Sequence, residues 1–183
     1  MKSLFMPIVA ASLPLFLFLG GCSSTPKPPI AQISLNVQND INPFLVNAKT
    51  PEARPVVIRL YELTSLAAFN STDFLSIFND YHSALGNELL SSEEFRLVPG
   101  MRQKFNRPLN IGTRYVGVVA AFRELERAQW KAFTTIPIKE KNPEIYIFLK
   151  EKEIMIGAKK SCGFFCRMWA PRSTPGTLYE VIE

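Results

Sequence analysis

Residues 31–38 alternate between polar and apolar side chains, with Ile33, Leu35 and Val37 as the apolar set. A repeat of two is the period of a β-strand with one buried face and one face in water. Turn signals such as Pro99–Gly100 separate further segments rich in β-branched and aromatic residues. These segments are residues 55–61, 94–98, 103–111, 114–122, 130–138, 144–150 and, less clearly, 152–156. The pattern predicts an all-β chain that folds as a β-sandwich of about seven to eight strands.

One segment, residues 64–86, departs from this pattern. Its aromatic and aliphatic residues recur at helical spacing, with Thr72 as the expected N-cap and Gly86 as the expected end. A shorter helix or turn over residues 65–69 is expected before it. Because an aromatic stripe of this kind normally packs on a sheet, we expect a small helical insertion after the second strand rather than a ligand site.

The composition is that of a chain with one ordinary core. The sequence has 183 residues, of which 47% are hydrophobic and 20% are charged, and its net charge is +5. These values exclude long disorder, a collagen and a multi-pass membrane protein. We expect a single sandwich domain over residues 31–156.

The first 21 residues have the features of an export signal. Lys2 precedes an uncharged run over residues 4–19, and small residues lead to a cysteine in Leu19–Gly20–Gly21–Cys22. The run is shorter than the ~20 residues that span a bilayer, and the whole segment is typical of a secretory signal. Its last four residues resemble the bacterial lipobox, in which the cysteine thiol becomes linked to diacylglycerol. We therefore expect residues 1–21 to be removed and Cys22 to be acylated; a plain signal peptide with an incidental cysteine is the alternative.

Residues 22–30 form the expected spacer between the lipid and the domain. Pro26, Pro28 and Pro29 favour an extended polyproline conformation, which would hold the domain away from the bilayer. The resemblance to lipoproteins also implies that Ser23, in place of an aspartate, directs sorting to the outer membrane. Outer-membrane lipid, reached through acylated Cys22, is thus one expected partner.

The sequence offers no recognisable catalytic or cofactor motif. His82 is the single histidine, and no G-x-S-x-G nucleophile motif is present. Residues 157–161 lack the upstream glycine of a phosphate-binding loop. We therefore predict a protein that is not an enzyme, with no metal, no cofactor and no small-molecule substrate.

Residues 39–54 join two predicted strands and are too long for a tight hairpin. Loops of this length are usually functional or disordered, and this one contains the apolar cluster Phe44–Leu45–Val46. An apolar tip on a rigid sandwich is typical of a docking loop. The alternative is that Phe44 or Leu45 folds back over the edge of the sandwich.

Residues 157–183 form a basic and aromatic C-terminal arm. The sequence has no acidic residue from Ile154 to Leu178, and aromatic residues such as Trp169 lie among its lysines and arginines. The arm either closes one end of the sandwich or contacts lipid headgroups or an acidic partner. Nucleic acid is not an expected partner of an exported lipoprotein.

The arm also holds the two remaining cysteines, Cys162 and Cys166. In an oxidising periplasm they are expected to form a disulfide. A regular helix would hold their Cβ atoms too far apart, so pairing predicts a non-helical loop. Two unpaired thiols in a buried turn are the alternative.

Several pieces of the sequence together resemble the outer-membrane lipoprotein family of the type VI secretion system, TssJ. The lipobox at Cys22 and the pair Asn42–Pro43 fit the family, as do residues 54–63 (RPVVIRLYEL) as its second strand. Further matches are Phe69, Asp73–Phe74, Leu89–Leu90, Pro99–Gly100, residues 117–123 and Trp130–Lys131. Each piece is short, and their order and spacing over roughly residues 19–150 carry the resemblance.

The resemblance implies a transthyretin-like sandwich that is anchored in the inner leaflet of the outer membrane and faces the periplasm. It also implies a structural role, in which the protein binds the periplasmic C-terminal region of the inner-membrane protein TssM. In the family, the loop between the first two strands carries much of this contact. By position, the expected partner-binding residues here are Asn42, Pro43, Phe44, Leu45 and Val46.

The sequence also permits a second hypothesis for the function. A transthyretin-like periplasmic lipoprotein could instead bind or process a cell-wall sugar or a small metabolite. That function requires a pocket of convergent polar groups. The residues beyond about 151 depart from the family pattern, so the resemblance implies nothing about the arm.

Overall fold

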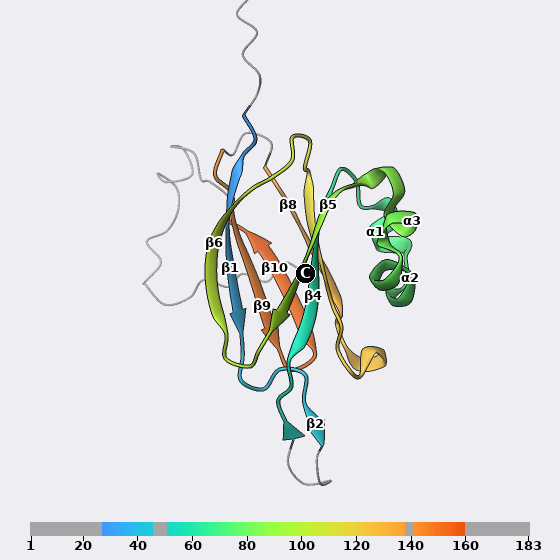
Figure 1. Ribbon diagram of the computed structural model, residues 1–183, viewed down its shortest axis with the longest axis vertical. Helices are drawn as coiled ribbons and strands as arrows, with labels where there is room; N and C mark the ends of the chain where they lie inside the picture. Colours follow the sequence, from blue (N-terminus) through green and yellow to red (C-terminus); the bar gives the residue numbers. More distant parts are fainter. Residues whose placement is uncertain (1–26, 46–50, 138–140, 160–183) are drawn as a thin grey trace, which may run out of the picture.

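The computed structural model describes residues 27–45, 51–137 and 141–159. Two four-stranded sheets form a β-sandwich, and three short helices lie on one side of it (Figure 1). Within the described ranges, no helix is long and apolar enough to cross a membrane. The predicted signal segment, Cys22, Val46, Cys162 and Cys166 lie outside the described residues, as does most of the C-terminal arm.

The first sheet is built around β1 (Ile30–Val37). Residues 31, 33, 35 and 37 of this strand are at most 2% exposed, and residues 32, 34 and 36 between them are half-buried. This confirms the predicted alternation. β1 pairs in parallel with β9 (Glu144–Lys150) and antiparallel with β6 (Arg102–Pro108), and β10 (Glu153–Ala158) extends the sheet beyond β9.

The second sheet has the order β5-β4-β7-β8 and is antiparallel throughout. β7 is buried on both faces, as befits a strand inside the sheet, and β5 begins at Leu89 rather than at residue 94. The apolar faces of the two sheets enclose the main core, and a bridge between Gln129 and Glu153 joins the sheets along one side. The strands are β4 (Val56–Leu63), β5 (Leu89–Leu97), β7 (Tyr115–Ala120) and β8 (Lys131–Thr135).

The helical insertion follows β4, the second long strand, as predicted, but its helices are divided differently. Thr72 does not cap a helix; the N-cap is Asp73, whose carboxylate accepts a hydrogen bond from the backbone N–H of Ser76. Asp80 ends this helix and caps the next one, so the single helix expected over residues 72–85 is broken in two. The helices are α1 (Ala67–Ser71), α2 (Phe74–Asn79) and α3 (Tyr81–Leu85), followed by the 3₁₀ turn η1 (Gly86–Glu88).

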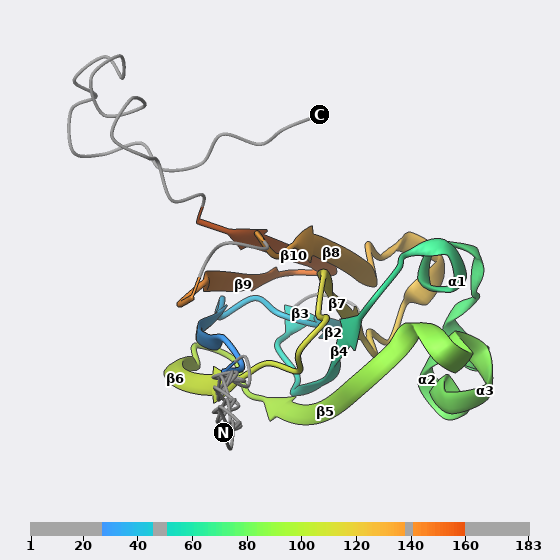
Figure 2. The same cartoon turned by 90° about the horizontal axis from the view of Figure 1, so that it is seen from above.

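These helices cover the face of the second sheet that points away from the first sheet (Figure 2). Phe69 and Ile77 are fully buried there against Tyr61 of β4. The phenol of Tyr61 donates a hydrogen bond to the backbone oxygen of Ile77 at 2.8 Å, and burial raises the pKa of Tyr61 to about 12. The aromatic stripe therefore packs on the sheet, as the sequence predicted.

The sandwich has two distinct ends, and β1 connects them (Figure 1). At the tether end, where the described chain starts, the backbone N–H of Leu109 donates to the oxygen of Pro29. At the loop end lies the connection between β1 and β4. This connection contains a short hairpin that the sequence did not predict, made of β2 (Phe44–Leu45) and β3 (Pro51–Glu52).

A buried carboxylate connects the two sheets near the tether end. Glu62 of β4 is 0% exposed, and it accepts hydrogen bonds from Arg107 of β6 at 2.8 Å and from the backbone N–H of Asn110 at 2.7 Å. The hydroxyl of Thr113 donates a further bond to it at 2.8 Å. Because each donor is directed at one carboxylate, the position of the loop that follows β6 depends on Glu62.

Replacing this carboxylate tests how strongly it supports the sandwich. Glu62→Ala leaves the Arg107 guanidinium without its buried partner, and we expect a loss of about 3–5 kcal/mol in the free energy of unfolding. Urea denaturation measures this loss. Glu124→Ala removes an exposed ion pair with Lys152 and should leave the midpoint nearly unchanged. Equal midpoints for the two variants would contradict the role given to Glu62.

Candidate functional site

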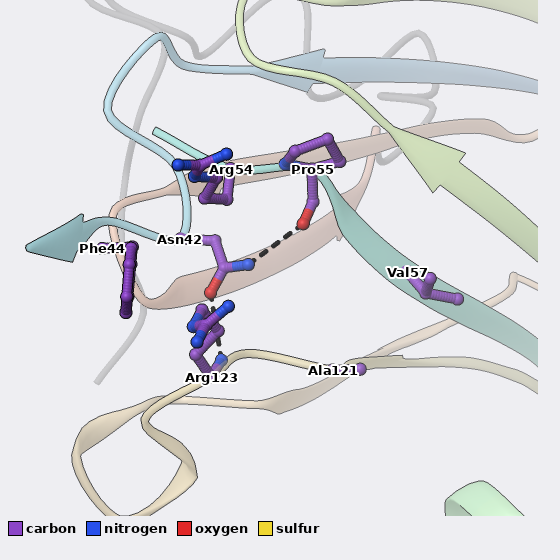
Figure 3. Close-up of a pocket in the computed structure, with 7 residues that line it drawn as sticks. All are labelled: Asn42, Phe44, Arg54, Pro55, Val57, Ala121 and Arg123. Atoms are coloured by element: carbon purple, nitrogen blue, oxygen red, sulfur yellow. Dashed lines mark hydrogen bonds between the residues drawn. The ribbon is translucent and has the colours of Figure 1, made fainter. Parts of the chain in front are cut away.

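The loop end is organised around the side chain of Asn42. This side chain is 4% exposed, and its Nδ2 donates to the backbone oxygen of Pro55 at 3.0 Å. Its Oδ1 accepts from the backbone N–H of Arg123 at 3.0 Å (Figure 3). The backbone N–H of Asn42 also donates to the oxygen of Glu151 at 2.6 Å. One residue therefore joins the β1–β4 connection to the segments that follow β7 and β9.

The backbone of Asn42 has a conformation that suits asparagine. Its φ is +49°, in the left-handed region that most residues avoid and that asparagine tolerates better than other non-glycine residues. The preceding residue, Ile41, is fully buried, and its backbone oxygen accepts a hydrogen bond from the N–H of Arg54 at 3.2 Å. The two ends of the connection are thus held together beneath the β2–β3 hairpin.

Phe44 follows this fixed segment of the chain, and its ring lies at the surface. The side chain is 39% exposed, and the guanidinium carbon of Arg123 lies 4.2 Å from the centre of the ring. The guanidinium carbon of Arg54 lies 5.9 Å from the same centre. Such cation–π contacts hold an aromatic ring in place without burying it. The ring therefore packs against arginines rather than folding back over the core.

A hollow of about 530 Å³ opens beside this ring (Figure 3). Aliphatic side chains form its wall, and the two arginines and Phe44 form its rim. The lining residues are Asn42, Phe44, Arg54, Pro55, Val57, Ala121 and Arg123. The hollow combines an apolar surface with positive charge, which suits contact with a peptide that carries both apolar and acidic side chains.

The two arginines differ in their charge partners. Arg54 is paired with Glu52 of β3 at 2.6 Å. Arg123 makes no ion pair with any residue that the structure describes. Its neighbour Glu124 is paired with Lys152 at 2.6 Å, and this hydrogen bond holds the pKa of Glu124 below its usual value. The positive charge of Arg123 is therefore the unbalanced one at the rim.

The structure separates the predicted partner-binding residues by role. Asn42 is buried and supports the loop from inside, Pro43 is half-buried, and Phe44 is exposed beside the hollow. Leu45 lies in β2, and Val46 is outside the described residues. Arg123 was not predicted as a site residue, because no pattern in a single sequence relates it to a loop about 80 positions earlier.

Among residues 27–45, 51–137 and 141–159, no group of three or more His, Cys, Asp or Glu side chains is placed to hold a metal ion. His82 lies exposed on α3, with its ring centre 4.3 Å from that of Tyr81 and the two rings tilted by 35°.

Comparison with known proteins gives a family and a set of similar structures. The sequence matches the family described as "Type VI secretion lipoprotein, VasD, EvfM, TssJ" over residues 29–159. The T6SS lipoprotein TssJ1 from Pseudomonas aeruginosa is 32% identical, with a TM-score of 0.66, over 74% of this chain and 99% of that one. No curated protein matches the chain.

Two further solved structures are similar. Serratia marcescens Lip, described as a membrane bound component of the type VI secretion system, is 26% identical, with a TM-score of 0.62, over 70% of this chain and 97% of that one. A chain in the structure described as the T6SS protein TssM C-terminal domain from EAEC is 20% identical. It matches with a TM-score of 0.54, over 69% of this chain and 98% of that one, which shows a shared fold.

Substitution of Asn42 tests the support of the loop. Asn42→Ala removes the hydrogen bonds to the backbone groups of Pro55 and Arg123 and places a Cβ-bearing residue with no side-chain amide at positive φ. We expect a loss of about 2–4 kcal/mol in the free energy of unfolding. Asn42→Gly loses the same bonds but tolerates the φ, so it should be less affected by roughly 1 kcal/mol.

Hydrogen exchange separates this role from a general loss of stability. The amide of Arg123 donates to Asn42, so its exchange should become faster in both variants, beyond the change seen for amides in the centre of β7. Unchanged protection of the Arg123 amide would show that Asn42 does not hold this segment.

Proposed function

Because this chain belongs to the type VI secretion lipoprotein family, we propose that it is a structural, non-catalytic component that links the outer membrane to the periplasmic C-terminal region of TssM. The observation that supports this most directly is the placement of the two ends. The chain enters at the tether end through Ile30, and the loop with Phe44 lies at the opposite end of β1.

At the membrane side, we propose that acylated Cys22 anchors the protein in the inner leaflet of the outer membrane. Residues 22–30 separate this cysteine from β1. In a polyproline conformation, a segment of this length spans about 25 Å, at roughly 3.1 Å per residue. The tether end would therefore face the bilayer, and the loop end would face the periplasm.

At the other side, we propose that the loop end binds the partner. Phe44 offers an exposed aromatic surface, and aromatic residues in small pockets often supply much of the binding energy of an interface. Asn42 fixes the loop before any partner arrives, and a preformed loop loses little conformational entropy on binding. The match to a chain in a structure described by the TssM C-terminal domain agrees with this choice of partner.

A charge introduced into the β1–β4 connection tests the partner site. We expect Phe44→Asp or Leu45→Asp to abolish pull-down of the purified periplasmic C-terminal region of TssM, because the apolar contact would be replaced by a solvated carboxylate. The thermal unfolding midpoint should stay within a few degrees of the original, since Phe44 is 39% exposed.

A matched control lies at the opposite end of the sandwich. Ile111 is an exposed aliphatic residue in the connection between β6 and β7, and Ile111→Asp should bind the partner normally. Retained binding by the Phe44 and Leu45 variants, or equal loss with Ile111→Asp, would refute the assignment of the loop end.

A separate experiment tests the anchor. Cys22→Ser removes the thiol that carries the lipid, so we expect the mature chain to move from the membrane fraction to the soluble periplasmic fraction, without incorporation of labelled palmitate. The same fractionation on Cys162→Ser serves as a control that should remain in the membrane. A Cys22→Ser protein that stayed membrane-bound would rule out the lipid as the anchor.

A further inference from the structure

We infer that the hollow beside Phe44 binds a carboxylate side chain of the partner, and that Arg123, which lies outside the docking loop, recognises it. The inference rests on the proposed function and specifies the chemistry of the partner segment. In this inference the interface is formed by two parts of the chain, the described residues of the β1–β4 connection and the segment that follows β7.

The guanidinium of Arg123 is held at the rim of the hollow by the ring of Phe44. Arg123 lies over the ring of Phe44 at 4.2 Å from its centre. A guanidinium held over a ring by cation–π attraction can still bind a carboxylate in bidentate fashion through its N–H groups. Phe44 therefore holds Arg123 at the rim of the hollow in addition to offering an apolar contact of its own.

The backbone of Arg123 is held in a fixed position by a hydrogen bond. Its N–H donates to the buried side chain of Asn42 at 3.0 Å, and the same side chain holds Pro55 on the other wall of the hollow. The two walls are thus set at a defined separation by one amide group (Figure 3). A ligand that fits between them meets donors that are already in place, which favours affinity.

The acidic residues near the rim of the hollow are already paired with other basic side chains. Glu52 neutralises Arg54, and Lys152 occupies the carboxylate of Glu124, the acidic residue next to Arg123 in the sequence. Among the described residues, Arg123 has no carboxylate partner of its own. An acidic side chain from outside would complete the pairing at the rim.

The walls of the hollow define the rest of the ligand. Val57 and Ala121 are half-buried and line the hollow together with Pro55. The volume of about 530 Å³ accommodates more than a single carboxylate. We therefore expect a peptide segment in which an aspartate or glutamate lies next to an aliphatic or aromatic residue.

The test uses the full mature chain and the purified periplasmic C-terminal region of TssM, with affinity measured at several salt concentrations. Arg123→Glu should weaken binding by at least about tenfold, since it replaces a charge-assisted pair with repulsion. Arg123→Lys keeps the charge but loses the planar donor edge. Its affinity for the partner should therefore lie between the affinities of the original protein and of Arg123→Glu. The original protein should show a steeper dependence on salt than Arg123→Glu.

A matched control comes from the same connection. Arg127 is exposed in the 3₁₀ turn η2 (Leu125–Arg127), and it makes no ion pair with a described residue. Arg127→Glu makes the same change of charge four positions away and should bind within about twofold of the original. A charge reversal of one acidic residue in the partner that restores binding to Arg123→Glu would identify the carboxylate directly.

The outcomes separate this inference from the proposed function. If Arg123→Glu binds like the original protein while Phe44→Asp does not bind, the carboxylate site is wrong and the docking loop stands. If Arg127→Glu weakens binding as much as Arg123→Glu, the effect is general charge repulsion and the site is also wrong. If the original protein does not bind this region of TssM, both proposals fail.

Discussion

The arrangement of the molecule depends on one strand that crosses it once. β1 lies inside the first sheet, with β6 on one side and β9 on the other, and its apolar residues lie in the main core. Because a strand is straight and extended, the segment before it and the connection after it must lie at opposite ends of the sandwich. The separation of the tether end from the loop end is therefore a consequence of the alternating pattern in residues 31–38.

The loop end needs a second constraint, since long connections have no regular hydrogen bonding of their own. Asn42 supplies it with a side chain that both donates and accepts, so that one buried group satisfies the backbone of Pro55 and of Arg123. An aspartate could accept but not donate here, and a serine is too short to reach both sides. The same amide that stabilises the connection also sets the width of the hollow. Phe44 and Arg123 lie on one side of it, and Pro55 lies on the other.

Much of the fold could be predicted from the sequence, because burial on one face of a strand leaves a direct periodic trace. The strands and the helical insertion follow from such traces. The break at Asp80 could not be predicted, since the apolar spacing continues through it and local capping decides the result. The candidate site was predicted only in part. Phe44 was identified from its apolar side chain and its place in the loop, although the sequence left open whether its ring is exposed. The roles of Asn42 and Arg123 depend on contacts between distant segments, which a single sequence does not record.

The position of β1 also bears on how a linking protein withstands tension. Under the proposed function, the membrane holds the chain before Ile30 and the partner holds it after Val37, so a pull acts along this strand. β1 is hydrogen-bonded to β6 over residues 30–36 and to β9 over residues 32–37. Because both attachment points lie on the same segment, the tension passes along the covalent backbone of β1, which is already extended in the sheet. The pull therefore does not need to separate β1 from either neighbouring strand. An edge strand in the same place would be held by one ladder, whereas β1 is held by ladders on both sides.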